Sequence, residues 1–253
     1  MKIAILGMVG AASFVAAADA GFSGFVASVR NSGAYTIIDI FAGVENASDK
    51  FLNVYNTKSD ATGGFFQATG LANKTWKPDA ASFNSTRSSI DSFMTAGTYS
   101  GGAYGGEFYA STNTTGDPNF TGTSWNATPA SPAATTIPVN AGWYTADPTS
   151  VDNSAESLAG LVGRVNGTLA SATAGGGPGE TSAAFGIWCA HLVVLGNNAT
   201  IGGALANVRF EAFVSIKDGI TGQTSQLSSS FVPAPGAIAL LSLAGFASRR
   251  RRA

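Results

Sequence analysis

The only cysteine and the only histidine of the chain, Cys189 and His191, stand two residues apart in the segment GIWCAHLVV. Side chains two residues apart on a β-strand share a face, so a Cys–His pair is geometrically conceivable. Their Cβ atoms would lie about 7 Å apart, given a rise of roughly 3.3 Å per residue. A catalytic thiol also needs an orienting group and an oxyanion site, and the sequence identifies neither. We therefore expect a buried cysteine beside a hydrogen-bonded histidine in a core strand.

Paired carboxylates are the second kind of chemistry to consider, because a glycosidase needs two carboxyl groups on either side of the scissile bond. The candidate acids are Asp39, Glu45, Asp91, Glu107, Asp147, Glu156 and Glu211. Nothing in the sequence brings a particular two of them together. A glycoside hydrolase of the cell envelope is therefore only the third functional hypothesis, and no catalytic residue is assigned.

Clusters of oxygen-bearing side chains are candidate calcium ligands, because Ca²⁺ binds carboxylate, amide and carbonyl oxygens. One candidate set consists of Asp147, Asp152, Asn153 and Glu156. A second combines Asp117 with Asn119 and neighbouring carbonyl groups. Neither set follows the EF-hand pattern, and Asp and Asn are also ordinary turn residues. A structural calcium ion is an option that the sequence leaves open, and no other cofactor is expected.

Large aromatic side chains are concentrated in the middle of the chain. Four of them are candidate ligand-binding residues, namely Trp76, Trp125, Trp143 and Tyr144. Exposed rings offer apolar area with a polar rim and can stack on sugars, which makes a carbohydrate-binding module the second functional hypothesis. Tryptophan and tyrosine are also mostly buried in folded proteins, so we expect most of these rings to hold loops in place.

The charge of the chain argues against nucleic acid as a partner. Charged residues make up only 11% of the 253 residues, and the formal net charge is −1. Between residues 21 and 230 there are nine cations and fourteen acids, which gives this body a charge of −5. A mildly acidic body lacks the basic surface that binds phosphate backbones.

The elements that must position these residues have the composition of an all-β domain. Residues 25–30 and 35–44 are apolar-rich runs separated by the turn cluster Asn-Ser-Gly, which predicts a hairpin. Residues 183–195 and 206–217 predict two further long strands, and in the second one Phe213 breaks an otherwise regular apolar–polar alternation. Residues 71–152 carry Pro or paired Gly about every ten residues and predict long loops.

Several strands without alternating helices indicate a single β-sandwich or jelly-roll-like domain with long loops, which we place at residues 21–226. No internal repeat of fixed period is present, which argues against a solenoid or a propeller. Within 158–169 the apolar spacing suits a helix, but three glycines weaken it, and we favour a strand there. Residues 227–235 are expected to form a polar and Pro-containing linker.

Both ends of the chain carry export signals. Lys2 is followed by an apolar run over 3–18 and by the small-residue motif Ala18-Asp19-Ala20, the order of a secretory signal peptide over residues 1–20. At the other end, residues 236–247 are apolar apart from Ser242 and predict a short helix. Four arginines at 249–252 follow after Ser248, and such a cluster predicts that the body faces away from the cytoplasm. The apolar run is shorter than the roughly twenty residues of an ordinary spanning helix.

The tail has three parts in a fixed order: a Val-Pro-Ala-Pro-Gly motif, an apolar stretch and terminal arginines. The positions that define it are Val232, Pro233, Pro235, Gly236, Arg249, Arg250, Arg251 and Arg252. Over about residues 231–253 the tail resembles the PEP-CTERM sorting tail of bacterial exported proteins, most of all the VPAPG-type variant of planctomycete-like surface proteins. Ala234 and Gly236 depart from the Pro-Glu-Pro pattern of that family.

The resemblance implies that an exosortase-like membrane protease cuts the tail near the Pro-rich motif and passes the protein outward. Because of the departures at Ala234 and Gly236, retention of residues 236–253 as a membrane anchor is the alternative. The implied partners are the export machinery, this protease and, for the carbohydrate-binding hypothesis, extracellular polysaccharide. The leading hypothesis is a non-enzymatic exported protein of the cell envelope or extracellular matrix with a structural or adhesive role.

Overall fold

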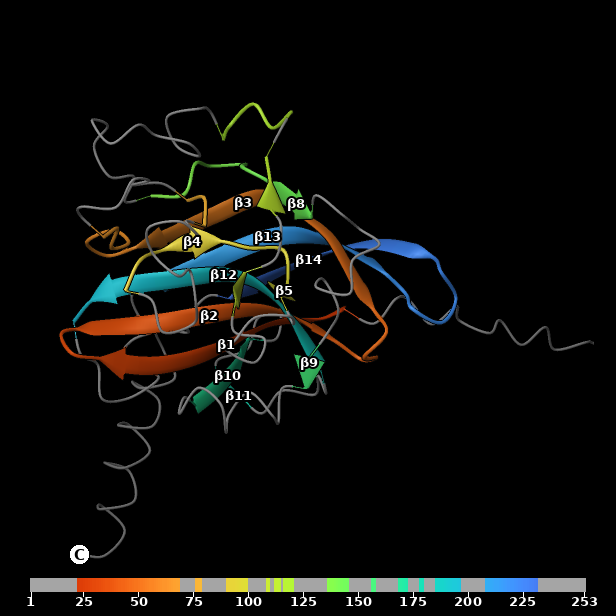
Figure 1. Cartoon of the computed structure of the whole chain (residues 1–253), viewed down its shortest axis with the longest axis horizontal. Helices are drawn as coiled ribbons and strands as arrows, with labels where there is room; N and C mark the ends of the chain where they lie inside the picture. The colour runs from red at the N-terminus through yellow and green to blue at the C-terminus, as the bar shows by residue number, and fades with distance from the viewer. Residues whose placement is uncertain are drawn as a thin grey trace, which may run out of the picture.

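The computed structural model describes residues 22–68, 76–78, 90–99, 108–109, 112–114, 116–120, 136–145, 156–157, 168–172, 178–179, 185–196 and 208–231. Every regular element in these ranges is a β-strand, and all strand pairs are antiparallel (Figure 1). The expectation of an all-β body is thus confirmed for the part of the chain that the structure describes.

The larger sheet, sheet A, has seven strands in the order β11-β10-β1-β2-β12-β4, and β9 also pairs with β12. Its strands are β1 (Phe22–Ser32), β2 (Tyr35–Val44), β4 (Phe93–Met94), β9 (Glu156–Ser157), β10 (Thr168–Ala172), β11 (Pro178–Gly179) and β12 (Phe185–Leu195).

The second sheet, sheet B, has five strands in the order β14-β13-β3-β8-β7. Its strands are β3 (Lys50–Ala61), β7 (Thr112–Asn113), β8 (Trp143–Thr145), β13 (Val208–Lys217) and β14 (Thr224–Phe231). Strands β5 (Thr98–Tyr99) and β6 (Phe108–Tyr109) form a separate two-stranded sheet.

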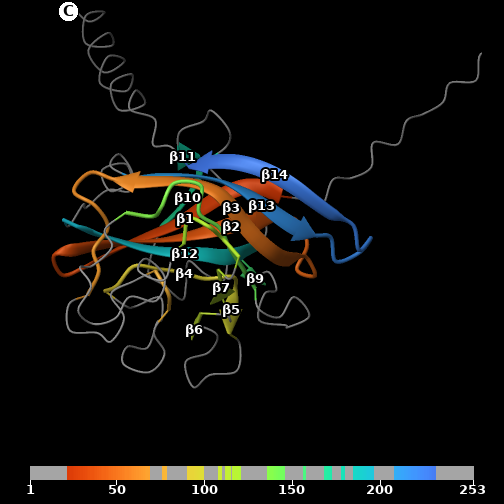
Figure 2. The same cartoon turned by 90° about the horizontal axis from the view of Figure 1, so that it is seen from above.

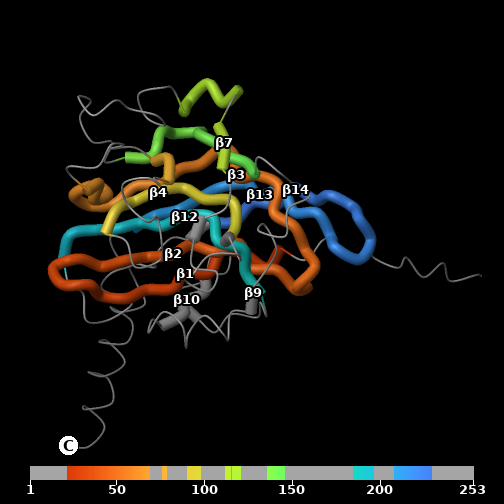
Figure 3. The backbone as a smooth tube through the Cα atoms, in the orientation of Figure 1, coloured from red at the N-terminus to blue at the C-terminus, as the bar shows by residue number. Residues whose placement is uncertain are grey.

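The centre of sheet A is the predicted hairpin β1–β2 lying beside β12, which Figure 3 traces as three long neighbouring segments. The hairpin closes through a two-residue loop, and Gly33 in this loop has a φ of +59°. Two-residue hairpin loops need a positive φ at their first central residue, which glycine adopts without steric cost. Every residue of β2 after Tyr35 is buried, as expected for a strand with apolar residues on both faces.

The two sheets pack face to face in two layers, the arrangement of a β-sandwich (Figure 2). Phe25 of sheet A meets Phe210 of sheet B edge to face, with ring centroids 5.0 Å apart. Phe210 also contacts Trp143, which in turn contacts Phe120. Edge-to-face aromatic pairs stabilise a core by about 0.5–1.5 kcal/mol beyond the burial of their area. This aromatic chain joins the two sheets.

The two sheets differ in how their outer faces meet solvent. On sheet A the row Val26, Phe41 and Trp188 lies on the face away from the sandwich core, and all three are buried. Sheet A is therefore covered on both faces. Sheet B instead has exposed side chains on its outer face, among them Lys58 and Ser228. An antiparallel sheet with one face in the core and one in solvent is a common arrangement.

Strand β14 extends the domain further along the chain than expected. Its backbone pairs with β13 from Lys217↔Thr224 to Phe210↔Phe231, so paired strand occupies the beginning of 227–235, where a linker was expected. The expected signal peptide, residues 1–20, and the expected apolar helix at 236–253 lie outside the described residues. Among the residues that the structure describes, no helix has the length and apolarity to cross a membrane.

Candidate functional site

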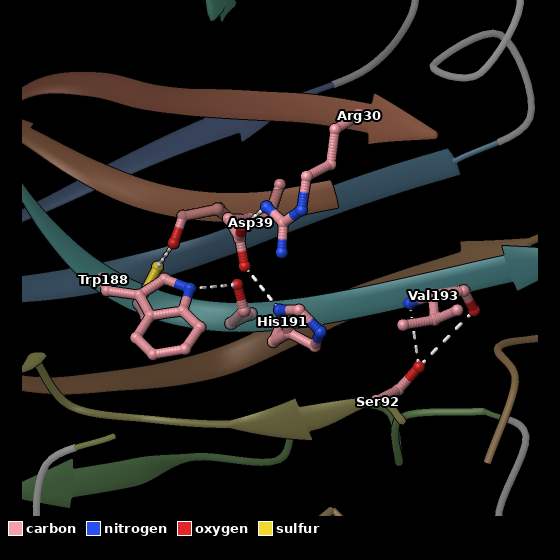
Figure 4. Close-up of polar contacts among 9 residues, drawn as sticks. Arg30, Asp39, Ser92, Trp188, His191 and Val193 are labelled. Carbon is pink, nitrogen blue, oxygen red and sulfur yellow. Dashed lines mark hydrogen bonds and ion pairs between the residues drawn. The ribbon is translucent and has the colours of Figure 1, made fainter. Parts of the chain in front are cut away.

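Three ionisable side chains meet on the outer face of sheet A: Arg30, Asp39 and His191, here called the buried Asp–His cluster (Figure 4). The Arg30 Nη1 donates to Asp39 Oδ2 over 2.6 Å, and His191 Nδ1 lies 2.5 Å from Asp39 Oδ1. Asp39 and His191 face each other in the strand register. Both side chains are fully buried, and the His191 ring stacks on Phe93 with centroids 4.7 Å apart. This cluster is therefore packed as part of the interior.

Cys189 and His191 do not share a face of β12, so the expectation from their spacing is wrong. The register shifts between Trp188↔Phe41 and Ala190↔Ile40, which marks a β-bulge at Cys189. A bulge inserts one extra residue and reverses the facing of the side chains beyond it. The Cys189 thiol points to the sandwich core and donates to the Ile40 carbonyl over 3.2 Å. Burial raises the pKa of this thiol, so it stays protonated and unreactive.

A serine lies on the neighbouring strand segment, but it does not complete a Ser–His–Asp arrangement. The Ser92 hydroxyl donates to the Phe66 carbonyl over 2.7 Å and accepts from the Val193 N–H over 2.9 Å. Figure 4 shows Ser92 beside Val193, away from the His191 ring. A nucleophile and its base must lie within hydrogen-bond reach and must be open to substrate. Ser92 and His191 are both fully buried, so the arrangement serves packing.

One candidate acid and two of the candidate aromatic residues lie in the interior. Asp91 is buried and accepts the Ala68 N–H over 2.8 Å, so it acts within the fold. Trp76 and Trp143 are buried, and their indole N–H groups donate to the Thr136 and Thr95 carbonyls. Neither tryptophan can offer an exposed ring to a ligand, because each one fills the core. Both tryptophans hold loops in place, which is what we expected from the sequence for most of these rings. Trp125 lies outside the described residues.

The calcium candidates are not brought together in the described part of the chain. Asp147, Asp152 and Asn153 lie outside it, and Glu156 is placed only through its backbone in β9. Asp117 Oδ1 accepts the N–H groups of Asn119 and Phe120. Within the described ranges, no three His, Cys, Asp or Glu side chains are grouped so that they could hold a metal ion. Asp117 is thus the organising residue of a turn.

The outer face of sheet B carries a second and different constellation, centred on two rings. Tyr55 of β3 and Phe213 of β13 face each other in the strand register, and their rings stack with centroids 5.3 Å apart and planes at 26°. The Tyr55 hydroxyl donates to Gln226 Oε1 on β14 over 3.3 Å. Phe213 is 36% exposed, although it is a large apolar side chain. We call this stacked pair the aromatic ridge.

A shallow depression lies on each side of the aromatic ridge. The first depression, with a volume of about 340 Å³, is lined by Phe213 together with Asn56, Lys58, Glu211, Ala212, Ser228 and Ser229. The second depression, of about 220 Å³, is lined by Tyr55 together with Asn53, Val54, Gly116, Asp117, Pro118, Gly142, Trp143 and Tyr144. Two predicted aromatic ligands, Trp143 and Tyr144, border this depression, but the Trp143 side chain is buried.

A bulge in β3 gives the first depression its shape. Glu211 pairs with Lys58 and Phe213 pairs with Tyr55, so β3 has one residue more than β13 between these positions. Asn56 lies in this bulge with a φ of +53°. The left-handed region is open to glycine and, at some cost, to asparagine. Because of the extra residue, Tyr55 and Lys58 both lie on the outer face although they are three positions apart.

The second depression is bounded by the turn at 116–120, which is hydrogen-bonded to the neighbouring segment at Asn140. Asn119 Nδ2 donates to the Asn140 carbonyl over 3.0 Å, and Asn140 N–H donates to the Thr57 carbonyl over 2.7 Å. Gly142 lies beneath the turn, where an added Cβ would stand 2.9 Å from the Val54 carbonyl oxygen and 3.2 Å from Asp117 Oδ2. Glycine is therefore required for this close approach. The Asn53 Oδ1 is buried there and has no hydrogen-bond partner.

The charges around the aromatic ridge are of both signs. Arg209 Nη2 lies 2.7 Å from Glu211 Oε1, and this hydrogen bond raises the pKa of Arg209. Lys58 and Asp117 contribute one positive and one negative charge. Of the charged groups that line the two depressions, Lys58 is positive and Glu211 and Asp117 are negative. The surface can thus bind hydrogen-bonding groups without selecting a strongly charged ligand.

Sequence reasoning missed Tyr55, Phe213, Asn53 and Lys58 as members of a surface site. One signal was present, because Phe213 is the apolar residue that breaks the alternation of 206–217. Comparison with known proteins adds no assignment: no protein-family model, no curated protein and no solved structure matches the chain.

Proposed function

We propose that the protein is a non-enzymatic component of the cell envelope or extracellular matrix with a structural or adhesive role. The observation that supports this proposal is the difference between the two sheets. The ionisable cluster on sheet A, with Asp39 and His191, is closed to solvent, whereas the outer face of sheet B offers rings and polar groups in shallow depressions. A broad open surface of this kind suits attachment to a partner, while chemistry usually takes place in a concave and largely enclosed pocket.

The export part of the proposal comes from the two ends of the sequence. The charged, apolar and small-residue segments of 1–20 predict removal of a signal peptide after Ala20. The tail from Val232 to the arginines at 249–252 resembles a sorting signal, and it predicts delivery to the cell surface through an exosortase-like protease. The body then faces away from the cytoplasm.

Cell fractionation combined with mass spectrometry of the native protein tests this proposal. We expect a mature N-terminus at Gly21 and recovery of the protein in the envelope or extracellular fraction. A variant in which Arg249, Arg250, Arg251 and Arg252 are all replaced by Ser should be missorted, because the positive charges that stop transfer are gone. A Lys217→Ser variant, which changes an exposed cation of the body, should be sorted like the native chain. Recovery of the unprocessed chain in the cytosol would refute the proposal.

A further inference from the structure

We infer that the aromatic ridge and its two depressions bind a neutral oligosaccharide, with sugar units placed on either side of Tyr55 and Phe213. This inference rests on the proposed adhesive function and names the ligand class for it. The sequence suggested tryptophans as the sugar-binding residues, whereas this inference assigns the role to Tyr55 and Phe213 on the outer face of sheet B.

The ridge provides the apolar part of such a site. A stacked pair of rings has one face of each ring turned toward the partner, and the remaining surface of the two rings borders opposite depressions. Phe213 borders the first and Tyr55 the second. Aromatic rings give rigid apolar area at a low cost in side-chain entropy. A pyranose ring has apolar C–H faces that suit this surface and hydroxyl groups around its edge that need polar partners.

The depressions provide those polar partners. Asn56, Lys58, Glu211 and Ser228 border the first, where amide, ammonium, carboxylate and hydroxyl groups stand within one hollow. In the second, Asn53 and Asp117 add an amide and a carboxylate group to the lining.

Asp117 and Tyr144 extend the second depression toward strands β7 and β8. The carboxylate of Asp117 borders it with its second oxygen near Gly142, while its first oxygen holds the turn. Tyr144 faces Asn53 in the strand register and borders the same depression. The surface therefore continues across four strands, from Ser228 on β14 to Tyr144 on β8.

The charges decide between neutral and charged ligands. The two linings hold one cation, Lys58, and two carboxylates, Glu211 and Asp117, and Arg209 nearby already pairs with Glu211. A polyanion would meet at least as many negative as positive groups in the linings, so this surface gives it no electrostatic advantage. A second copy of the chain is disfavoured as well, because Phe213 is the one large exposed hydrophobic side chain on the described central strands of this sheet face. Stable protein interfaces bury roughly 800 Å² on each partner around an apolar centre.

Calorimetric titration of the purified full-length chain with cellohexaose, laminarihexaose, xylohexaose and chitohexaose tests the inference. A heparin hexasaccharide serves as the charged comparison. We expect saturable binding of at least one neutral probe. Tyr55→Ala and Phe213→Ala should each weaken it about tenfold or more, the loss typical of removing an aromatic side chain from the centre of a binding surface. Tyr55→Phe should retain binding within about threefold, because it keeps the ring.

Tyr35→Ala is the matched control. Tyr35 is also a half-buried tyrosine beside a phenylalanine ring, Phe66, but it lies at the hairpin end of sheet A. This variant should bind like the native chain. Phe213→Leu keeps most of the apolar volume and removes only the ring, so it replaces Phe213→Ala if the latter is not folded under the titration conditions. It should lose binding as well.

Several results would overturn the inference: no neutral probe binds the folded chain, binding survives both ring removals, or only the heparin probe binds. Sedimentation of the native chain as a dimer that Phe213→Leu converts to a monomer would also overturn it, because the ridge would then be a contact between copies. Titration of the purified protein does not depend on where the protein resides in the cell. If the protein reaches the cell surface but binds no neutral oligosaccharide, only the inference about the ligand fails. If the purified protein binds an oligosaccharide but the native protein is found in the cytosol, only the proposed surface role fails.

Discussion

Trp188 and His191 lie on the same face of strand β12, with ring centroids 5.8 Å apart and ring planes at 87°, although they are three positions apart in the chain. Regular alternation would place them on opposite faces. The bulge at Cys189 supplies the extra residue and turns the cysteine toward Ile40 in the core. A similar irregularity in β3 places Tyr55 and Lys58 together on sheet B. In both sheets a bulge, rather than a loop, decides which side chains meet.

The Cys189 thiol should be inert in the native protein. Because burial raises its pKa and the thiol donates to Ile40, little thiolate forms at neutral pH. We expect no reaction with a thiol-specific disulfide reagent under native conditions and one equivalent of reaction in denaturing urea. Rapid reaction of the folded chain would show that the core opens at this bulge.

Removing the charge of Asp39 should destabilise the fold strongly. Asp39→Asn leaves the Arg30 guanidinium without its carboxylate partner on a buried sheet face. Breaking a buried ion pair by removing one partner costs about 3–5 kcal/mol. Urea unfolding measures this loss, with Asp60→Asn as the control, because Asp60 is exposed and its replacement should change stability by about 0.5 kcal/mol or less. A loss below about 1 kcal/mol for Asp39→Asn would contradict the prediction.

The two phenylalanines of β13 should respond very differently to truncation. Phe210 is fully buried between the sheets, so Phe210→Ala should lower the free energy of unfolding by about 3–5 kcal/mol. Phe213→Ala removes only the exposed ring contact with Tyr55 and should cost about 1 kcal/mol. Denaturant unfolding of both variants checks the facing of this strand. Equal losses would mean that β13 presents another face to the core.

Asn56 should tolerate glycine but not a β-branched residue. Its φ of +53° lies in the left-handed region, which costs a non-glycine residue roughly 1–2 kcal/mol. Asn56→Gly should therefore leave stability unchanged or slightly increased, whereas Asn56→Val should lower it by about 1–2 kcal/mol or more. Thermal and urea unfolding give the comparison. A stable Asn56→Val variant would indicate that the bulge moves elsewhere.

The Asp218 carboxylate should make the fold sensitive to acid. Hydrogen bonds from the Thr221 and Ile220 N–H groups lower its pKa. A carboxyl group with a depressed folded-state pKa stabilises the fold above its unfolded pKa of about 3.9, and this stabilisation is lost as pH falls through the folded value. Asp218→Asn should therefore have a lower urea midpoint than the native chain at pH 7. The two midpoints should converge in acid, and a constant difference down to about pH 2 would disagree with this linkage.

Much of the framework was predictable from local pattern. The hairpin of β1 and β2, the burial of both faces of β2 and the inward set of β13 follow from apolar periodicity and from turn residues such as Gly33. These features depend on neighbours in sequence. The side-by-side packing of Asp39 and His191, which are 152 positions apart, depends on strand register and could not be predicted from one strand alone.

The site was less predictable than the framework for the same reason. A β-bulge is defined by the register of one strand against the strand that it pairs with. The sequence of one strand alone therefore does not show that Cys189 and Asn56 lie in bulges. Trp143 was a candidate ligand because of its type, but its ring fills the space beside Phe210. Tyr55 belongs to the surface site because register brings it opposite Phe213, whose irregular place in the alternation was visible.

The pairing of β14 has a mechanical consequence for an anchored protein. Phe231 is the last residue of this edge strand and directly precedes Val232, where the proposed sorting tail begins. If the tail is fixed to the cell and sheet B binds a glycan, a pulling force between these two points would act on the fold through Phe231. A pull along the strand axis would be resisted in shear by eight paired positions loaded together, whereas a perpendicular pull would open them one after another like a zipper. The strength of attachment would then depend on the direction of flow past the cell.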